Sequence, residues 1–269
     1  MNERMSVYFV AHQDDWQLFM DPNVSKDLID PYCKTLIIHT TAGDAGNGES
    51  FWRARELGAI NSVLFRLTSR LKIDEIEKVI SINDRNIYVA EIHNCSIYFL
   101  RLPDGGMYGE GFELYNYQSL SKIRLKQAES ICSVDNLNEF HSLEEIAECI
   151  DSILEREIAH FAKGERHPLI LNLPEFDLAL NPNDHNDHFN TSMLLHKTDL
   201  YQQAKKYAFV HYDIQSSGRD LIGEDLFWKV GMFCAYHQTV MEVEGYSTID
   251  ESPLYKVWST REPIYREIH

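Results

Sequence analysis

Two short clusters of histidine and aspartate hold residue types that bind divalent metals. The first contains His12 and Asp15, and the second contains His185 and His188. In each pair the residues are three positions apart, and positions i and i+3 share a face in the first turn of a helix. Each pair can therefore converge on one point. Three protein ligands drawn from imidazole and carboxylate, with one position left open, form the catalytic type of zinc site.

The chemistry that such a site supports is hydrolysis of an amide. Zinc lowers the pKa of bound water to about 7 and also polarises a carbonyl group. Asp14 adjoins a ligand without being one, so it is placed to take the proton from that water. A protonated His185 is placed to stabilise the oxyanion and to donate to the leaving amine. The alternative interpretation of Asp14 is an N-cap for the helix that follows.

Both clusters also resemble the motifs of a known family. Residues 11–15, Ala-His-Gln-Asp-Asp, resemble the Ala-His-Pro-Asp-Asp signature of the PIG-L/LmbE-like zinc-dependent N-deacetylases, and residues 185–188 resemble their His-Pro-Asp-His motif. Residues 53–59 are similar to the family's Arg-x-x-Glu-x-x-Ala helix, and residues 102–105 look like its strand-end Asp-Gly turn. The order and spacing agree over about residues 6–240.

The resemblance implies a role for each matched position. It implies zinc as the cofactor, with another divalent metal as the alternative, and three ligands, namely His12, Asp15 and His188. Asp14 matches the general base, and His185 matches the histidine that assists at the tetrahedral intermediate and the leaving amine. Asp187 would orient a ligating or catalytic imidazole. The implied activity removes an N-acetyl or other short N-acyl group from a small substrate that contains an amino sugar.

Three positions depart from the family pattern. Gln13 and Asn186 stand where the family has proline, and Trp16 stands where it has an acidic residue. The prolines stiffen turns and bind no metal, so the ligand set survives their loss. We expect Trp16 to lie at the pocket edge and to alter the choice of substrate.

Four further residues are candidates for substrate contacts. Arg53 or Arg55 is placed to bind hydroxyls or an anionic group, with an arginine on the outer surface of a helix as the alternative. Asp104 either binds sugar hydroxyls or caps its own turn. Arg219 follows a predicted strand at its carboxyl end, which makes it the last candidate.

Strands alternate with helices along the chain. Short apolar runs predict strands over residues 6–11, 35–39, 169–173 and 208–214, with a hairpin over 86–92 and 96–102. Helical patterns cover residues 50–67, 143–161, 187–206 and 226–240. This alternation predicts a single domain over residues 1–269 of the α/β class, with a Rossmann-like, doubly wound, mainly parallel sheet and helices on both faces. We expect the site at the switch point, where the strands over 6–11 and 169–173 lie side by side.

Composition excludes several partners. The formal net charge is −17, which argues against nucleic acid because phosphate binding needs clustered lysine and arginine. The apolar runs are too short to span a membrane, and the N-terminus lacks the pattern of a signal peptide, so we expect a cytoplasmic protein acting on a small molecule. The five widely spaced cysteines are expected to be reduced and mostly buried. The oligomeric state stays open, a homo-oligomer included.

Two other functions are alternatives to catalysis. A non-catalytic nucleotide binder of Rossmann type needs Gly-x-Gly-x-x-Gly after the first strand, where this chain has acidic residues that repel a pyrophosphate. A degenerate member of the same fold would bind its ligand without hydrolysing it. Retention of Asp14 beside the metal ligands argues against that second alternative.

Overall fold

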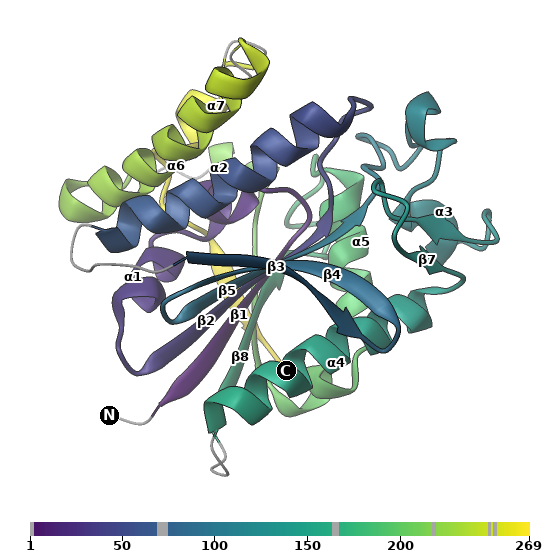
Figure 1. Cartoon of the computed structure of the whole chain (residues 1–269). Coiled ribbons are helices and arrows are strands. Elements are labelled where there is room, and N and C mark those ends of the chain that lie inside the picture. The colour runs from purple at the N-terminus through teal and green to yellow at the C-terminus, as the bar shows by residue number, and fades with distance from the viewer. Residues whose placement is uncertain (1–2, 69–74, 163–166, 217–218, 247–248, 250–251) are drawn as a thin grey trace.

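One eight-stranded sheet forms the centre of the molecule (Figure 1). The computed structural model describes residues 3–269 apart from 69–74, 163–166, 217–218, 247–248 and 250–251. Among these residues the strand order is β10-β9-β8-β1-β2-β5-β4-β3. The strands are β1 (Arg4–Val10), β2 (Cys33–Thr41), β3 (Glu75–Ile82), β4 (Arg85–Ile92), β5 (Cys95–Leu102), β8 (Leu169–Pro174), β9 (Lys205–Phe209) and β10 (Tyr265–Ile268). The inner run β9-β8-β1-β2-β5 is parallel, while β10, β4 and β3 pair antiparallel at the two edges.

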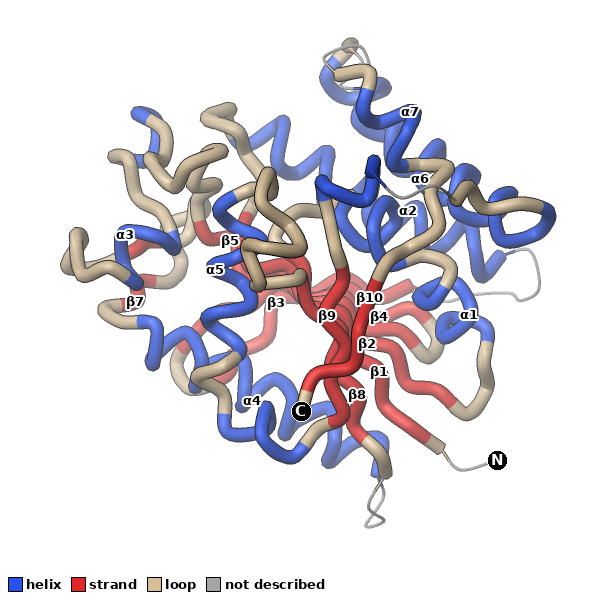
Figure 2. The backbone as a smooth tube through the Cα atoms, turned by 180° about the vertical axis from the view of Figure 1, so that it is seen from behind, coloured by secondary structure: helices blue, strands red, loops and turns tan. Residues whose placement is uncertain are grey.

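Helices cover both faces of this sheet, as Figures 1 and 2 show. One face carries α1 (Asn23–Ile29), α2 (Glu49–Thr68) and α6 (Gly223–Glu244), and the other carries α3 (Leu120–Arg124), α4 (Leu143–Ala162) and α5 (Asn186–Leu195). The short α7 (Leu254–Trp258) packs beside α6. The remaining elements are the π-helix η1 (Trp16–Met20), the 3-10 turns η2 (Glu113–Tyr115), η3 (Asp199–Gln203) and η4 (Tyr212–Ser216), and a small ladder of β6 (Ile131–Cys132) with β7 (Glu139–Phe140).

Alternation along the central strands builds one core on each face. In β1, Val7 and Phe9 pack into the core under α4 and α5, while Tyr8 and Val10 pack into the core under α1 and α2. A strand that is covered on both faces needs apolar residues at nearly every position. This is why the run over residues 6–11 reads as continuously apolar, and why the predicted parallel α/β fold is confirmed.

Two predicted elements near the C-terminal side of the sheet are wrong in their bounds. The helix expected over 187–206 ends at Leu195, where His196 caps it and Thr198 turns the chain into η3. The strand expected over 208–214 is β9, which begins three residues earlier. Lys206, which the prediction placed in the helix, is buried in the strand, and its ammonium lies over the ring of Tyr201 at 4.7 Å. Pairing with β8 therefore overrides local propensity.

The other local predictions agree with the structure, within a few residues, wherever a strong pattern exists. The hairpin of β4 and β5, the helices α2, α4 and α6, and strands β1, β2 and β8 all form as expected. All five cysteines are free thiols, three of them buried. In the described part of the chain, no helix combines the length and apolar character that a membrane span needs.

Candidate active site

The two histidine clusters meet at the carboxyl ends of two adjacent parallel strands. β1 ends at Val10 and pairs with β8, which ends at Pro174. The turn after β1 carries His12 and Asp15, and the first turn of α5 carries His188. β1 lies at the point where the chain, having wound to one side through β2, returns on the other side as β8. The predicted switch point therefore holds the site.

Three side chains converge there on one small volume. His188 Nε2 lies 3.0 Å from Asp15 Oδ1 and 3.3 Å from His12 Nδ1, and His12 Nδ1 lies 3.6 Å from Asp15 Oδ1. All three residues are at most 5% exposed. Three donor atoms at such mutual distances can all reach one ion at the 2.0–2.2 Å typical of zinc. The sequence-predicted ligands are thus brought together in the geometry that a metal requires.

Buried carboxylates favour positive charge at this point. Burial lowers the pKa of His188, but Asp15 and Asp184 outweigh it and raise that pKa to about 10. Burial raises the pKa of Asp15, yet His188 and His12 bring it well below its ordinary value. Without a metal, a protonated imidazole supplies the cation that these carboxylates stabilise.

Asp184 holds His188 in its orientation. Its Oδ1 lies 2.7 Å from His188 Nδ1, and its Oδ2 accepts a hydrogen bond of 2.6 Å from Asn181. The backbone N–H of Tyr212 also donates to Asp184. A carboxylate on one imidazole nitrogen fixes the tautomer and leaves the other nitrogen for a metal. The sequence interpretation gave Asp184 no role, although its place one residue before His185 was a signal.

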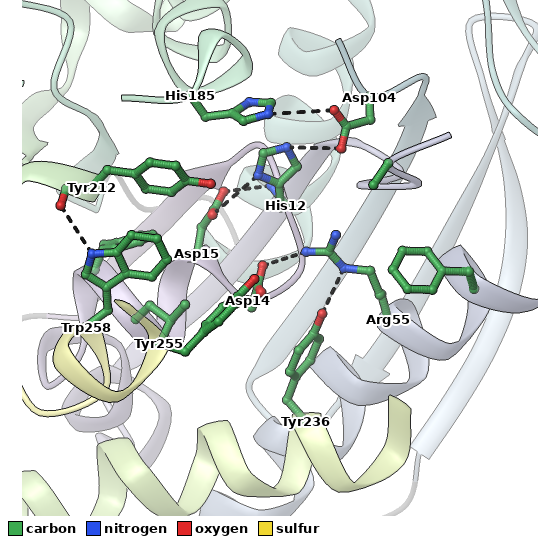
Figure 3. A pocket seen from close by; sticks show the side chains of 14 residues that line it. His12, Asp14, Asp15, Arg55, Asp104, His185, Tyr212, Tyr236, Tyr255 and Trp258 are labelled. Carbon is green, nitrogen blue, oxygen red and sulfur yellow. Dashed lines mark hydrogen bonds and ion pairs between the residues drawn. The ribbon is translucent and has the colours of Figure 1, made fainter. Parts of the chain in front are cut away.

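A second group lies on the other side of His12 (Figure 3). His12 Nε2 lies 3.7 Å from Asp104 Oδ2 and 3.6 Å from Asp187 Oδ2, and it is buried without a hydrogen bond among the described residues. Asp187 Oδ2 accepts a hydrogen bond of 2.8 Å from the backbone N–H of Gly105. Asp187 is therefore fixed beside His12, and its role in orienting an imidazole stays a prediction.

His185 and Asp104 face each other across the pocket mouth. His185 Nε2 lies 3.8 Å from Asp104 Oδ1, and His185 Nδ1 accepts from the backbone N–H of Asp187 at 3.2 Å. Burial and the neighbouring His12 lower the pKa of His185. A neutral ring that accepts at Nδ1 carries its proton on Nε2, on the side of Asp104. Asp104 caps its own turn through the N–H of Gly106, as one interpretation expected, and it also lines the pocket, where binding of sugar hydroxyls stays a prediction.

Asp14 lines the pocket beside the ligands and is held by an arginine. Arg55 donates to Asp14 Oδ1 at 2.6 Å, and its other hydrogen bonds go to the hydroxyl of Tyr236 and the carbonyl of Gly43. No hydrogen bond among the described residues engages Asp14 Oδ2. No helix N–H is seen donating to this carboxylate either, so the structure gives the N-cap alternative no support.

Three of the predicted substrate contacts lie away from the pocket, which corrects those expectations. Trp16 is fully buried in the core with Tyr8 and Val10, because η1 turns its side chain inward. Arg53 lies on the outer side of α2 and pairs with Glu49. Arg219 is exposed and does not line the pocket.

An aromatic wall completes a cavity of about 170 Å³. The sequence interpretation missed it, because its members come from η4, α6 and α7 and carry no local motif. They are Tyr212, Tyr236, Tyr255 and Trp258, with Leu18, Phe19 and Phe51 beside them. The cavity thus lies between this apolar side and the corner formed by His12, Asp15, His185 and His188, which we call the histidine corner.

The fold has counterparts among solved structures. No protein-family model matches the sequence, and no curated protein does. The chain is similar to a deacetylase triple mutant (Orf2*T) of the teicoplanin biosynthetic pathway, with 12% identity and a TM-score of 0.52, over 98% of this chain and 97% of that one. It is also similar to a deacetylase–bog complex from teicoplanin biosynthesis, with 11% identity and a TM-score of 0.50, over 94% of this chain and 89% of that one. The chain therefore shares the fold of these two deacetylases, as the resemblance of its motifs predicted.

Proposed function

We propose that this protein is a divalent-metal-dependent amide hydrolase, with zinc as the metal. It removes an N-acetyl or other short N-acyl group from a small, amino-sugar-containing substrate. The observation that carries the proposal is the convergence of His12, Asp15 and His188 on one point, with Asp14 beside them and not among them. The shared fold with a deacetylase supports the same reaction class.

The residues present fit a zinc ion. Two imidazole nitrogens and one carboxylate oxygen form a normal catalytic ligand set, and two of these residues, His12 and Asp15, line the cavity from which a substrate would approach. Asp184 on His188 and Asp187 near His12 supply the carboxylates that typically support ligating histidines. A bound divalent ion would polarise the acyl carbonyl and lower the pKa of the attacking water.

The chain's own residues then handle the protons. Asp14 Oδ2 takes a proton from the attacking water, while Arg55 holds the other oxygen and fixes the direction of the carboxylate. His185 donates a hydrogen bond from Nε2–H to the oxyanion, a role that suits its lowered pKa better than donation of a proton. Asp14 returns its proton to the leaving nitrogen as the C–N bond breaks. The products are a carboxylic acid and a free amine.

Asp14→Asn tests the proposal. It preserves size and removes the basic carboxylate, so metal content should match that of the wild type, while the lost ion pair with Arg55 should lower the free energy of unfolding without preventing folding. Loss of a general base typically lowers the rate about 10²–10⁴-fold. We expect kcat for amine release from an N-acetylated amino sugar to fall by that order with little change in KM, because the lost interaction acts in the transition state. A near-normal kcat would remove Asp14 as the base. No amine release by metal-loaded wild type across N-acylated sugars would remove the proposed function.

A further inference from the structure

The aromatic wall is a set of mutually packed rings that faces the cavity. Tyr212 stacks on Trp258 with ring centroids 4.6 Å apart, and Tyr255 meets the same indole edge-on at 5.4 Å. The indole N–H of Trp258 donates to the carbonyl of Tyr212. Trp258 is buried, whereas Tyr212 and Tyr255 are only half-buried, so parts of these two side chains remain accessible. Figure 3 shows this wall beside the histidine corner.

Charge in the cavity is strongly one-sided. Three carboxylates line it, and two more lie directly behind its histidines; these are Asp14, Asp15 and Asp104, with Asp184 and Asp187 behind. Among the described lining residues Arg55 is the one lysine or arginine, and it is already committed to Asp14, Tyr236 and Gly43. A divalent ion would still leave the carboxylates in excess. An anionic group on a substrate would therefore meet repulsion without a free cation to pair with.

We propose that the site selects an uncharged N-acyl glycoside and rejects phosphorylated or carboxylated ones. An apolar face of the substrate packs on Tyr212 and Tyr255 while the amide reaches the histidine corner. This inference rests on the proposed function and adds the class of substrate to it. The same carboxylates favour the ammonium form of the product amine.

The direct test compares two ligands that differ only in charge. Methyl N-acetylglucosaminide and its 6-phosphate are titrated calorimetrically into zinc-loaded Asp14→Asn protein, and amine release from both is measured with the wild type. We expect the neutral ligand to bind at least about 10-fold more tightly. Equal or tighter binding of the phosphate, or no binding of the neutral ligand at millimolar concentration, would overturn the inference. Tight binding of the neutral ligand without amine release would overturn the proposed function and leave the selectivity standing.

A charge placed at the rim sharpens this test. Ala45 lines the cavity, is exposed, and already has a positive φ of 46°, so a longer side chain adds little strain there. Ala45→Lys should bind the 6-phosphate more tightly, and so reduce the ratio of the two dissociation constants several-fold. Ala45→Gln introduces a side chain of similar length without the charge, and should leave the ratio of the two dissociation constants unchanged. An equal effect of both variants would contradict an electrostatic origin.

The wall has its own test. Tyr255→Ala should weaken binding of the neutral glycoside about 2–10-fold, as expected for loss of one aromatic contact, and Tyr255→Phe should restore most of it. The matched control is Phe227→Ala on α6, which is 60% exposed and does not line the cavity. Unchanged binding in Tyr255→Ala would remove the wall from the substrate site.

Discussion

Two buried clusters of charged side chains in this molecule differ in how many of their polar atoms have a hydrogen-bond partner. Arg101 donates to both carboxylate oxygens of Glu56 at 2.7 Å and to Asp135 at 2.9 Å, and its side chain is 3% exposed. At the switch point, by contrast, His12 Nε2 is buried without a hydrogen bond and faces oxygens more than 3.5 Å away. The first cluster is closed, whereas the second leaves a buried imidazole nitrogen without a hydrogen-bond partner among the described residues.

The pairing of buried polar atoms distinguishes structural residues from candidate functional ones better than their burial does. Glu56 lies in the helix motif that resembles the deacetylase family, yet its carboxylate is fully used in an ion pair on the inner side of α2. At the switch point His12 Nε2, which faces Asp104 and Asp187 and not the three predicted ligand atoms, stays unpaired among the described residues, which costs stability. We therefore assign Glu56 and Arg101 to the fold, and we propose the histidine corner as the catalytic site.

The largest expected effect is on the closed cluster. Arg101→Met leaves Glu56 buried without its partner, which typically costs about 3–5 kcal/mol of unfolding free energy. Urea unfolding measures this loss, and the double variant Glu56→Leu/Arg101→Met should recover much of it. Metal content of the folded protein should not change. A loss below about 1 kcal/mol in the single variant would contradict a structural role.

The second-largest effect is expected on metal affinity, through the carboxylate of Asp184 that contacts His188. Asp184→Asn keeps the size of the side chain and weakens its hold on His188, so metal affinity should fall about 10–100-fold. Competition with a chelator of known affinity measures the change. Asn183→Ala, one residue away and bonded to Asp213 instead, is the control. Equal metal affinities in Asp184→Asn and wild type would show that Asp184 does not support the ligand.

A third effect appears only in acid. His39 is fully buried against Phe99, and burial lowers its pKa to about 3. The unfolded chain, with a histidine pKa of about 6.5, binds the proton first, so stability is lost as pH falls from about 6.5 towards 3. Through this group, the free energy of unfolding at pH 5 is about 2 kcal/mol lower than at pH 7. His39→Leu should remove that share of the acid sensitivity in urea unfolding at the two pH values; an unchanged pH dependence would refute it.

The smallest effect is expected at Arg53. Its ion pair with Glu49 is solvent-exposed, so Arg53→Ala should change stability by less than about 0.5 kcal/mol and kcat by less than about 2-fold. Arg55→Ala should lower kcat much more, because it releases Asp14. Steady-state kinetics of both variants on one substrate check this. A large loss in Arg53→Ala alone would reverse the assignment.

The sequence could predict what is local. Each histidine cluster follows a strand whose apolar run is unmistakable, so β1, β8 and the corner between them followed from adjacent residues. Two positions along a helix differ by about 200° in direction, so only the packed structure shows that Arg55 faces the cavity and Arg53 does not. The prediction for Trp16 was wrong because its place next to the motif does not determine the direction of its side chain. The π-helix η1 turns that side chain into the core.

The aromatic wall could not be predicted for a different reason. Tyr212, Tyr255 and Trp258 are far from both motifs in sequence, and tertiary packing of η4 and α7 brings them to the cavity. Aromatic residues are more often core than pocket, so composition gave no signal. Such surfaces form where segments that are far apart in the sequence pack together, so no short stretch of the sequence predicts them.

Metal content of the purified protein tests the central claim most directly. We predict about one divalent ion per chain in the wild type, and nearly none in His188→Ala, measured by elemental analysis after dialysis. Circular dichroism should show that the variant stays folded, since His188 belongs to none of the three apolar clusters. Full occupancy in His188→Ala, or a wild type that binds no ion from zinc-containing buffer, would contradict the account.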